Sequence, residues 1–344
     1  MYEYLSIMTP QLIAEVIAKE SSDFPAILTK PEQLLKFLEI NSDDIHFYDS
    51  FASSFSFRVP LSFAKRMKKG DKNDPLLRQV LSIGPAMQAP AAPFGFGADP
   101  VQDKKYQVLP GLIHKYYGRV LLVATGACSV HCRYCFRQSF PYQNAVLAND
   151  NWNNILNYIK ADTSIEEVIL SGGDPLVLSL DKLQKIGEAL NDIPHLKYIR
   201  IHSRQPVVFP ESIDGGVMRF FSELRLKTLL VIHANHPNEL DNAVKKHLRL
   251  WGRFNIQMLN QSVLLKGVND SIDILKALSH RLYALDVLPY YLHVLDKVAG
   301  SEHFLISKAR SRQLIYQLGG QLPGFLVPAL VYDEGGSYGK IRLI

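Results

Sequence analysis

Short runs rich in β-branched and aliphatic residues alternate with helical patterns along most of this 344-residue chain. The strand-like runs are 119–125, 167–170, 198–202, 228–233, 255–259 and 287–292. The helical patterns between them are 152–160, 180–190, 217–224, 239–251 and 272–282. Strands that alternate with helices build a parallel sheet through right-handed crossovers. Because six such units are fewer than the eight of a closed barrel, we predict an α/β fold, a partial (β/α)6 TIM-like barrel.

The chain before this alternating stretch has a different pattern. Apolar residues spaced three and four apart at 10–18 and 31–38 predict helices, so residues 1 to about 85 are interpreted as a helical region. A proline-rich stretch at 85–105 predicts an irregular connector. We therefore divide the chain into an N-terminal helical region with its connector (1–105), a barrel core (106–300) and a C-terminal segment (301–344).

A polar cluster follows each predicted strand. The clusters are 128–135, 171–174, 202–204, 233–236, 260–262 and 293–296. Parallel α/β folds bind their ligands at the carboxyl ends of the strands. Any single cluster is equally well explained as an ordinary turn, but six in succession favour a binding site.

Composition excludes several classes of protein. The net charge is +5, and the densest basic run, 65–69, is interpreted as a solvated face, so nothing calls for nucleic acid. The first ten residues lack a signal-peptide pattern, and no stretch approaches the roughly 20 apolar residues of a membrane span. Three cysteines in the whole chain argue against a disulfide framework. We expect a soluble, cytoplasmic protein with no membrane partner.

All three cysteines stand within eight residues, as Cys128, Cys132 and Cys135 in a C-x3-C-x2-C spacing. Thiolates are soft ligands that suit zinc or iron–sulfur clusters. A closed zinc site needs a fourth ligand, which His131 or a distant histidine would have to supply. A structural cluster normally has four cysteines, and this chain has three. The spacing therefore favours a [4Fe-4S] cluster with one iron left open to a small molecule.

The C-x3-C-x-φ-C pattern, with Tyr134 at the aromatic position, resembles the signature of radical S-adenosylmethionine enzymes. The run 171–175 is similar to their glycine-rich motif. This resemblance implies that the open iron binds S-adenosylmethionine, whose reductive cleavage yields a 5′-deoxyadenosyl radical. The residues implied on the S-adenosylmethionine side are Tyr134, Gly172, Gly173, Asp174, Ser203, Arg204, His233 and Gln261.

A narrower resemblance, to lysine 2,3-aminomutases, covers about residues 50 to 344. The similar segments are 111–119, 128–137, 171–176, 202–208, 235–239, 260–270, 289–291 and 327–340. The run 290–297 and the length are most similar to the short, EpmB-type members. Those members make (R)-β-lysine for the modification of translation elongation factor P.

This second resemblance implies pyridoxal 5′-phosphate as a further cofactor and assigns roles residue by residue. Lys340 matches the lysine that carries the pyridoxal group. Lys115, Tyr116 and Arg119 match residues on its phosphate side, although Lys115 stands where an arginine is expected. Arg137 matches the arginine that binds the substrate carboxylate. Asp296 and Asp333 match the aspartates that hold the ε-ammonium of lysine.

We therefore expect an isomerase that converts (S)-α-lysine to (R)-β-lysine. Its expected partners are the small-molecule substrate L-lysine, an elongation factor P ligase that receives the product, and an electron-donor protein. The chain ends four residues after Lys340, so we expect a monomer or homodimer in place of the tetramer of longer members. Three alternatives stay open: a lysine aminomutase of catabolism, an aminomutase acting on glutamate or another amino acid, and a non-catalytic metal-binding module.

Overall fold

The computed structural model describes residues 24–41, 56–81, 95–142, 149–334, 337 and 339–343. The helix predicted at 10–18 lies outside these residues. The helix predicted at 31–38 is confirmed as α2, Pro31–Leu38.

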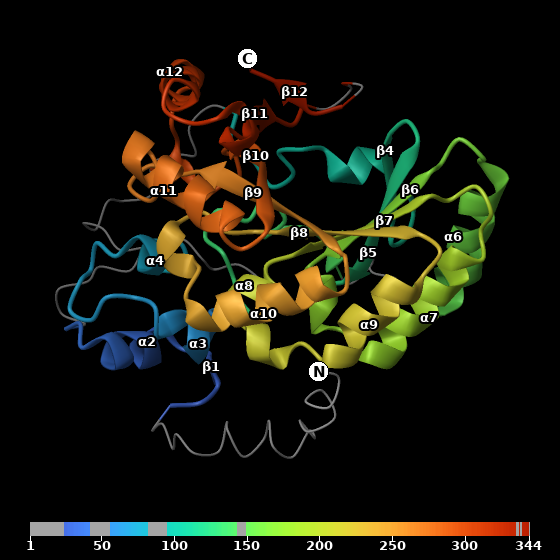
Figure 1. Ribbon diagram of the computed structural model, residues 1–344, viewed down its shortest axis with the longest axis horizontal. Helices are drawn as coiled ribbons and strands as arrows, with labels where there is room; N and C mark the ends of the chain where they lie inside the picture. Colours follow the sequence, from blue (N-terminus) through green and yellow to red (C-terminus); the bar gives the residue numbers. More distant parts are fainter. Residues whose placement is uncertain are drawn as a thin grey trace.

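One ten-stranded sheet forms the centre of the molecule (Figure 1). Its strands are β3 (Gln107–Leu109), β4 (Leu112–Tyr116), β5 (Arg119–Thr125), β6 (Glu167–Gly172), β7 (Tyr198–Ser203), β8 (Lys227–Ile232), β9 (Gln257–Leu264), β10 (Val287–Val294), β11 (Ala329–Tyr332) and β12 (Ile341–Arg342). Neighbours in the sheet are neighbours in the chain, and β5 to β11 all run parallel. Antiparallel strands flank them, β3 and β4 at one edge and β12 at the other. In the part of the chain described, β3 and β12 stand at the two ends of the strand order and do not pair with each other, as expected for an incomplete barrel.

A helix follows each of the first six parallel strands. These helices are α6 (Asn149–Ala161), α7 (Leu180–Asn191), α9 (Gly215–Glu223), α10 (Asn242–Arg253), α11 (Ile272–Tyr283) and α12 (Lys308–Gly319). Their apolar residues recur at helical spacing, as with Val244, Leu248 and Trp251 of α10, all of which are fully buried. Figure 1 shows α6, α7, α9 and α10 along the same side of the sheet. The six predicted strands and the five helices predicted between them are confirmed, and α12 is a helix that the sequence analysis did not predict.

The structure adds a seventh parallel strand that the sequence analysis did not predict. Strand β11 pairs with β10 in parallel register, with Leu330 opposite Leu292. Four residues are too few to show a strand period, so this strand is decided by its pairing and not by its own pattern.

Four strands also run further than predicted. β6 continues through Ser171 and Gly172, β7 through Ser203, β9 through Asn260 to Leu264, and β10 through His293 and Val294. Several of the polar residues predicted to follow these strands therefore lie inside them. Polar residues usually end a strand pattern, but here one face of the sheet lines a cavity, where polar side chains are tolerated.

The described N-terminal region packs as a small unit of its own. It contains α2, two short helices, α3 (Leu61–Ala64) and α4 (Pro75–Arg78), and an unpredicted antiparallel pair, β1 (Ile27–Leu28) with β2 (Val59–Pro60). Its apolar cluster extends to Val130 in the cysteine loop and to Val208 in the short helix α8, Gln205–Val208. The region is therefore joined to the barrel next to the cysteines.

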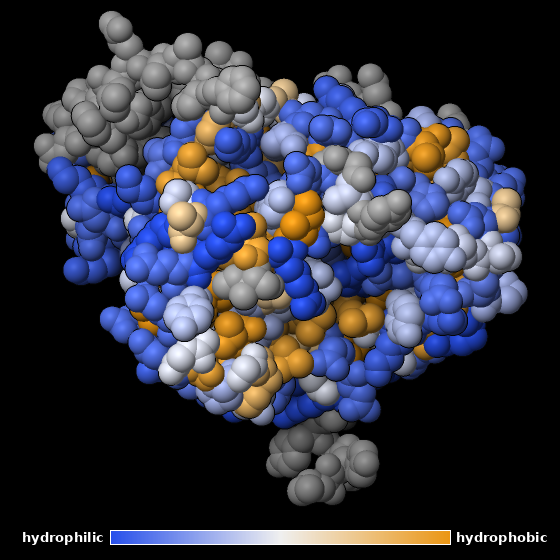
Figure 2. Space-filling view, turned by 90° about the horizontal axis from the view of Figure 1, so that it is seen from above, coloured by the Kyte–Doolittle hydropathy of each residue, from blue (hydrophilic) through white to orange (hydrophobic). Residues whose placement is uncertain are grey.

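Short 3₁₀ turns complete the elements. They are η2 (Asp103–Tyr106), η3 (Pro175–Val177), η4 (Pro210–Ser212), η5 (Pro237–Glu239), η6 (Glu302–Phe304) and η7 (Gly324–Leu326). On the face shown in Figure 2, hydrophobic residues form separate groups among hydrophilic ones. Among the described helices, none has the length and apolar character that crossing a membrane requires.

Candidate functional site

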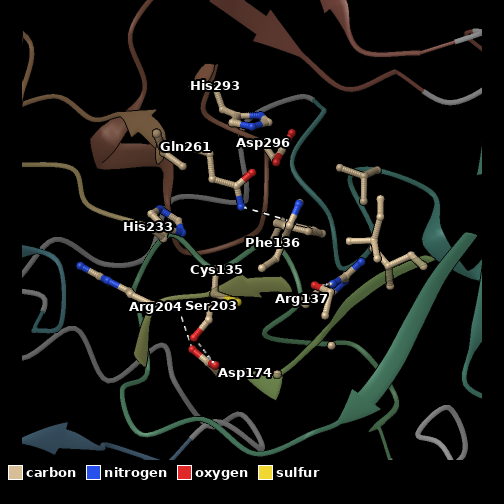
Figure 3. Close-up of a pocket in the computed structure, with 18 of the residues that line it drawn as sticks. Cys135, Phe136, Arg137, Asp174, Ser203, Arg204, His233, Gln261, His293 and Asp296 are labelled. Carbon is tan, nitrogen blue, oxygen red and sulfur yellow. Dashed lines mark hydrogen bonds between the residues drawn. The ribbon is translucent and has the colours of Figure 1, made fainter. Parts of the chain in front are cut away.

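A single cavity of about 300 Å³ brings the predicted site residues together (Figure 3). Every residue predicted for the site lines it: Lys115, Tyr116, Arg119, Cys128, Cys132, Tyr134, Cys135, Arg137, Gly172, Gly173, Asp174, Ser203, Arg204, His233, Gln261, Asp296, Asp333 and Lys340. Most of them come from the carboxyl-terminal parts of β5 to β11 and from the loops that follow, in agreement with the prediction that ligands bind at that edge of the sheet. Lys115, Tyr116 and Arg119 differ, because Arg119 is the first residue of β5 and pairs with Tyr116 of the antiparallel strand β4.

The loop after β5 carries the three cysteines. Its backbone is tied to the N-terminal region, because the amide of His131 donates to the carbonyl of Arg58 at 2.9 Å and that of Arg133 to the carbonyl of Gln79 at 2.8 Å. Burial, reinforced by the neighbouring thiols, raises the pKa of Cys135 to about 12, and burial together with Asp174 raises the pKa of Cys128. These thiols stay protonated until a metal displaces their protons.

The donor set fits an iron–sulfur cluster better than zinc. Within the described ranges, no three His, Cys, Asp or Glu side chains converge on the position of a single metal ion. Each thiolate of a cluster binds a different iron, so its ligands need not converge on one point. His131, the candidate fourth zinc ligand, has its Nδ1 against the carbonyl of Ser56. The residues present therefore fit a [4Fe-4S] cluster held by three cysteines.

Two glycines, Gly172 at the end of β6 and Gly173 directly after it, are required because the backbone of the cysteine loop lies against them. Gly172 has a φ of +115°, and a Cβ there would lie 2.5 Å from the carbonyl oxygen of Thr125. A Cβ on Gly173 would lie 2.3 Å from the carbonyl oxygen of Ala127. The amides of Gly173 and Asp174 donate to these same two carbonyls, at 2.6 and 2.8 Å. The absence of a Cβ at both positions therefore allows the end of β6 to approach the loop that carries the cysteines.

Asp174 joins the ends of β6 and β7. Its carboxylate accepts from Ser203 Oγ at 2.6 Å, from the amide of Arg204 at 2.7 Å and from that of Gln205 at 2.9 Å. Burial raises the pKa of Asp174, and these hydrogen bonds oppose the rise. Figure 3 shows Ser203 and Asp174 together at one edge of the cavity. Their side chains thus hold the strand ends in register.

Arg137 is fixed by an acid that the sequence analysis missed. Its guanidinium pairs with Asp103 at 2.8 Å and donates to Ser171 Oγ at 3.1 Å, and both charged side chains are almost fully buried. Asp103 lies in η2, within the segment predicted to be an irregular connector. In the sequence, Asp103 is one aspartate at the end of a proline-rich run. Such residues are too common for one of them to be singled out as functional. The connector therefore forms part of the cavity wall.

Asp333, directly after β11, gathers the residues predicted for the pyridoxal group. Its carboxylate pairs with Lys115 and with Lys340, the latter at 3.2 Å, and accepts from Tyr116 Oη at 2.9 Å. Burial acts to raise the pKa of Asp333, but Lys340, Lys115 and Tyr116 lower it overall. Lys115, predicted to contact phosphate, and Asp333, predicted to contact an ammonium, are here paired with each other.

Asp296 and three histidines line the neighbouring wall. Burial raises the pKa of Asp296 to about 7, which Lys340 opposes. Burial lowers the pKa of His202 and His293, and lowers that of His233 to about 3, so all three imidazoles are neutral. His202 and His293, to which the sequence analysis assigned no individual role, also line the cavity. Figure 3 shows His293 and Asp296 side by side.

Comparisons with known proteins identify the family. The "4Fe-4S single cluster domain" family matches residues 117–198. An L-lysine 2,3-aminomutase from Haemophilus influenzae is 42% identical over 331 residues, which are 95% of this chain and 97% of that protein. The chain belongs to the L-lysine 2,3-aminomutase family. The relative from Escherichia coli is also 42% identical, with 92% of each chain covered. That from Clostridium subterminale is 31% identical, covering 90% of this chain and 74% of its own.

Among solved structures, a radical SAM methyltransferase from Sphaerobacter thermophilus aligns with 64% of this chain and 68% of its own. It is 16% identical, with a TM-score of 0.46. Membership of the L-lysine 2,3-aminomutase family confirms the predicted enzyme class, an isomerase of the aminomutase type. The cluster-domain match and the three cysteines agree with the predicted [4Fe-4S] cluster, at which radical SAM enzymes bind S-adenosylmethionine.

Proposed function

We propose that this protein converts (S)-α-lysine to (R)-β-lysine as a radical SAM, pyridoxal phosphate-dependent aminomutase. The observation that carries the proposal is the shared cavity: the three cysteines and Lys340, more than 200 positions apart in the chain, line the same 300 Å³ space. Cys128, Cys132 and Cys135 hold the cluster in this proposal. An enclosed space is needed because a reactive radical must be kept from solvent.

Lys340 supplies the amine that binds the pyridoxal group. Pyridoxal phosphate contributes a conjugated π system through which an amino group passes between adjacent carbons. Asp333 holds the Lys340 ammonium 3.2 Å away and so fixes its place in the cavity. Lys115 and Tyr116, which contact the same carboxylate, and Arg119, stacked 5.0 Å from the Tyr116 ring, are assigned to the phosphate. Lys115 gives that phosphate a charge but no bidentate contact.

The charges of the cavity match those of lysine. Arg137, held by Asp103, is assigned to the substrate carboxylate, since a guanidinium accommodates a carboxylate through two parallel hydrogen bonds. Asp296 and Asp333 are assigned to the ε-ammonium. Leaving a buried charge unpaired costs several kcal/mol, on the order of 3–5. A glutamate side chain would place its carboxylate against Asp296, so the cavity favours a cationic substrate.

We further propose that the product serves elongation factor P. The support is the resemblance of the run 290–297 to the short family members. In this role a separate ligase receives β-lysine, and an electron-donor protein reduces the cluster. We place the protein in the cytoplasm, where free thiols persist and the translation factor acts.

The activity is tested with protein purified and reconstituted anaerobically. Reduced protein is incubated with L-lysine, S-adenosylmethionine and pyridoxal phosphate, and β-lysine is measured by chromatography. We expect β-lysine from lysine and no β-amino acid from glutamate. A cluster-loaded protein that forms no β-lysine contradicts the proposal.

The cellular role is tested separately by deleting the gene and measuring the mass of elongation factor P. Loss of a β-lysyl addition, restored by the wild-type gene but not by one encoding Lys340→Ala, supports the role. An unchanged mass contradicts the elongation factor role and leaves the aminomutase activity standing.

A further inference from the structure

Arg204 lies in a buried network between the cysteine loop and the N-terminal region. It stands directly after β7, with a side chain 6% exposed. Its Nη1 donates to Sγ of Cys132. Its Nη2 donates to Gln79 Oε1 at 2.7 Å and to Glu239 Oε2 at 3.0 Å. Figure 3 shows the side chain extending away from Arg137 and from the middle of the cavity.

The surroundings keep this guanidinium charged. Its Cζ lies 5.4 Å from the centre of the Phe63 ring and 5.6 Å from that of Tyr134. Burial acts to lower the pKa of Arg204, but Cys132, Tyr134 and Glu239 raise it overall. Glu239, wholly buried, has a lowered pKa, because the Arg204 cation and hydrogen bonds outweigh its burial. A paired and hydrogen-bonded charge of this kind persists in the interior.

Glu239 and Gln79 have few other positions available to them. Glu239 Oε1 accepts from Gln79 Nε2 at 3.0 Å and from the amides of Asn235 and His236 at 2.9 and 3.0 Å. Gln79 Oε1 also accepts from Asn235 Nδ2 at 3.0 Å. Both side chains are therefore fixed, and they aim Arg204 at one sulfur atom.

We propose that Arg204 tunes the reduction potential of the cluster through Cys132, as a positioning residue held by Glu239 and Gln79. This inference rests on the proposed role of Cys132 as an iron ligand. Reduction adds one electron, and hence one negative charge, to the cluster and its sulfur ligands. A charged donor at a ligand sulfur stabilises the more negative state and so raises the potential. The reaction begins with this reduction, so Arg204 favours the step that all later chemistry needs.

A structural role alone would give a different result. Arg204 also links the cysteine loop to the N-terminal region, so its loss could simply loosen the loop and release iron. The potential of the remaining clusters would then be unchanged. Measuring iron content and potential on the same samples separates the two roles.

The test compares Arg204→Gln and Arg204→Lys with a control, Arg225→Gln. Arg225 is exposed and donates to backbone carbonyls at 191–196, so this control removes the same charge elsewhere. Each protein is reconstituted anaerobically, assayed for iron and sulfide, and titrated with dithionite under electron paramagnetic resonance, without S-adenosylmethionine or lysine. We expect Arg204→Gln to lower the reduction equilibrium constant at least tenfold, about 59 mV for one electron.

Arg204→Lys keeps the charge but cannot reach all three partners, so we expect a smaller fall. The control should match wild type. An unchanged or higher potential in a cluster-loaded Arg204→Gln protein overturns the inference. So does loss of iron from both Arg204 variants. If only Arg204→Gln loses iron, the Arg204→Lys protein decides the question, and a reduction potential equal to that of wild type then overturns the inference. Wild-type protein that binds no cluster overturns the proposed function instead.

Discussion

The cavity wall contains two groups of residues that are held in place by different means. The cysteine group is Cys128, Cys132 and Cys135 with Arg204. Its one charged pair, Arg204 with Glu239, is 6% and 0% exposed and is hydrogen-bonded through Arg204 Nη2. The lysine group is Lys340, Lys115, Asp333 and Asp296. Its pair of Lys340 with Asp333 is 26% and 12% exposed, and Lys115, 6% exposed, pairs with the same carboxylate. Among the described residues, no hydrogen bond or ion pair holds the Asp296 carboxylate.

This difference suits the two proposed roles. The cysteine group would hold a permanently bound cluster, whereas the lysine group would bind a substrate that enters and leaves. The cysteine group is anchored from residues 56–79, from the end of β6 and from η5, so its geometry is fixed before any ligand arrives. In the lysine group, cations and carboxylates neutralise one another and can exchange partners when a zwitterionic substrate enters.

The largest effects are expected from Lys340→Ala and Cys132→Ala, each of which should disable one group and leave the other intact. Lys340→Ala should retain iron and sulfide like wild type but lose pyridoxal absorbance, and its β-lysine formation should fall at least about 1,000-fold. Cys132→Ala should show the opposite pattern, with bound pyridoxal phosphate and no iron. Metal analysis and absorbance spectra measure both. Loss of iron from Lys340→Ala would mean that the two groups are not independent.

Asp296→Asn tests the lysine group alone. Removing one partner of a buried ion pair costs about 2–3 kcal/mol, so we expect the KM for lysine to rise about 30- to 150-fold with cluster content unchanged. Steady-state kinetics at saturating cofactors give the value. Retained lysine affinity would show that the ε-ammonium binds elsewhere.

Lysine binding should weaken below pH 7. With the pKa of Asp296 raised to about 7 before substrate binds, the carboxyl is increasingly protonated, and so uncharged, as the pH falls through that value. The affinity for the ε-ammonium should then fall by up to about tenfold per pH unit. Calorimetric titration with lysine from pH 5.5 to 8 measures this. In Asp296→Asn the same profile should be flat, and a slope that survives in the variant would assign the effect to another group.

Asp103→Asn should have the smallest effect. The amide still accepts a hydrogen bond from Arg137 but no longer neutralises it, so Arg137 is less well aimed at the substrate carboxylate. We expect a rise of about fivefold in the KM for lysine, close to 1 kcal/mol, with little change in kcat. Asp181→Asn, in the exposed first turn of α7, is the matched control. An effect on kcat equal to that on KM would place Asp103 in the reaction step.

The elements with strong patterns were predictable. The six predicted strands, the five helices between them and α2 have apolar residues at the spacing of their own secondary structure, and each of these helices is long enough to show it. The cysteine spacing and the resemblance of the tail around Lys340 also predicted, from the sequence alone, residues that line the cavity. Strand β11, Asp103 and Glu239 were missed because each owes its place to a partner distant in the chain. Nothing local distinguishes a four-residue strand, or an aspartate in a proline-rich run.

The order of residues alone therefore fixed the strand alternation, the three-cysteine ligand set and the family to which the chain belongs, since all of these are local patterns. Only the folded chain determined which charges meet. Lys115 came to face Asp333 and Arg204 came to face Cys132 through long-range packing of strand ends and of the N-terminal region, and such contacts depend on distances in space that no sequence spacing encodes.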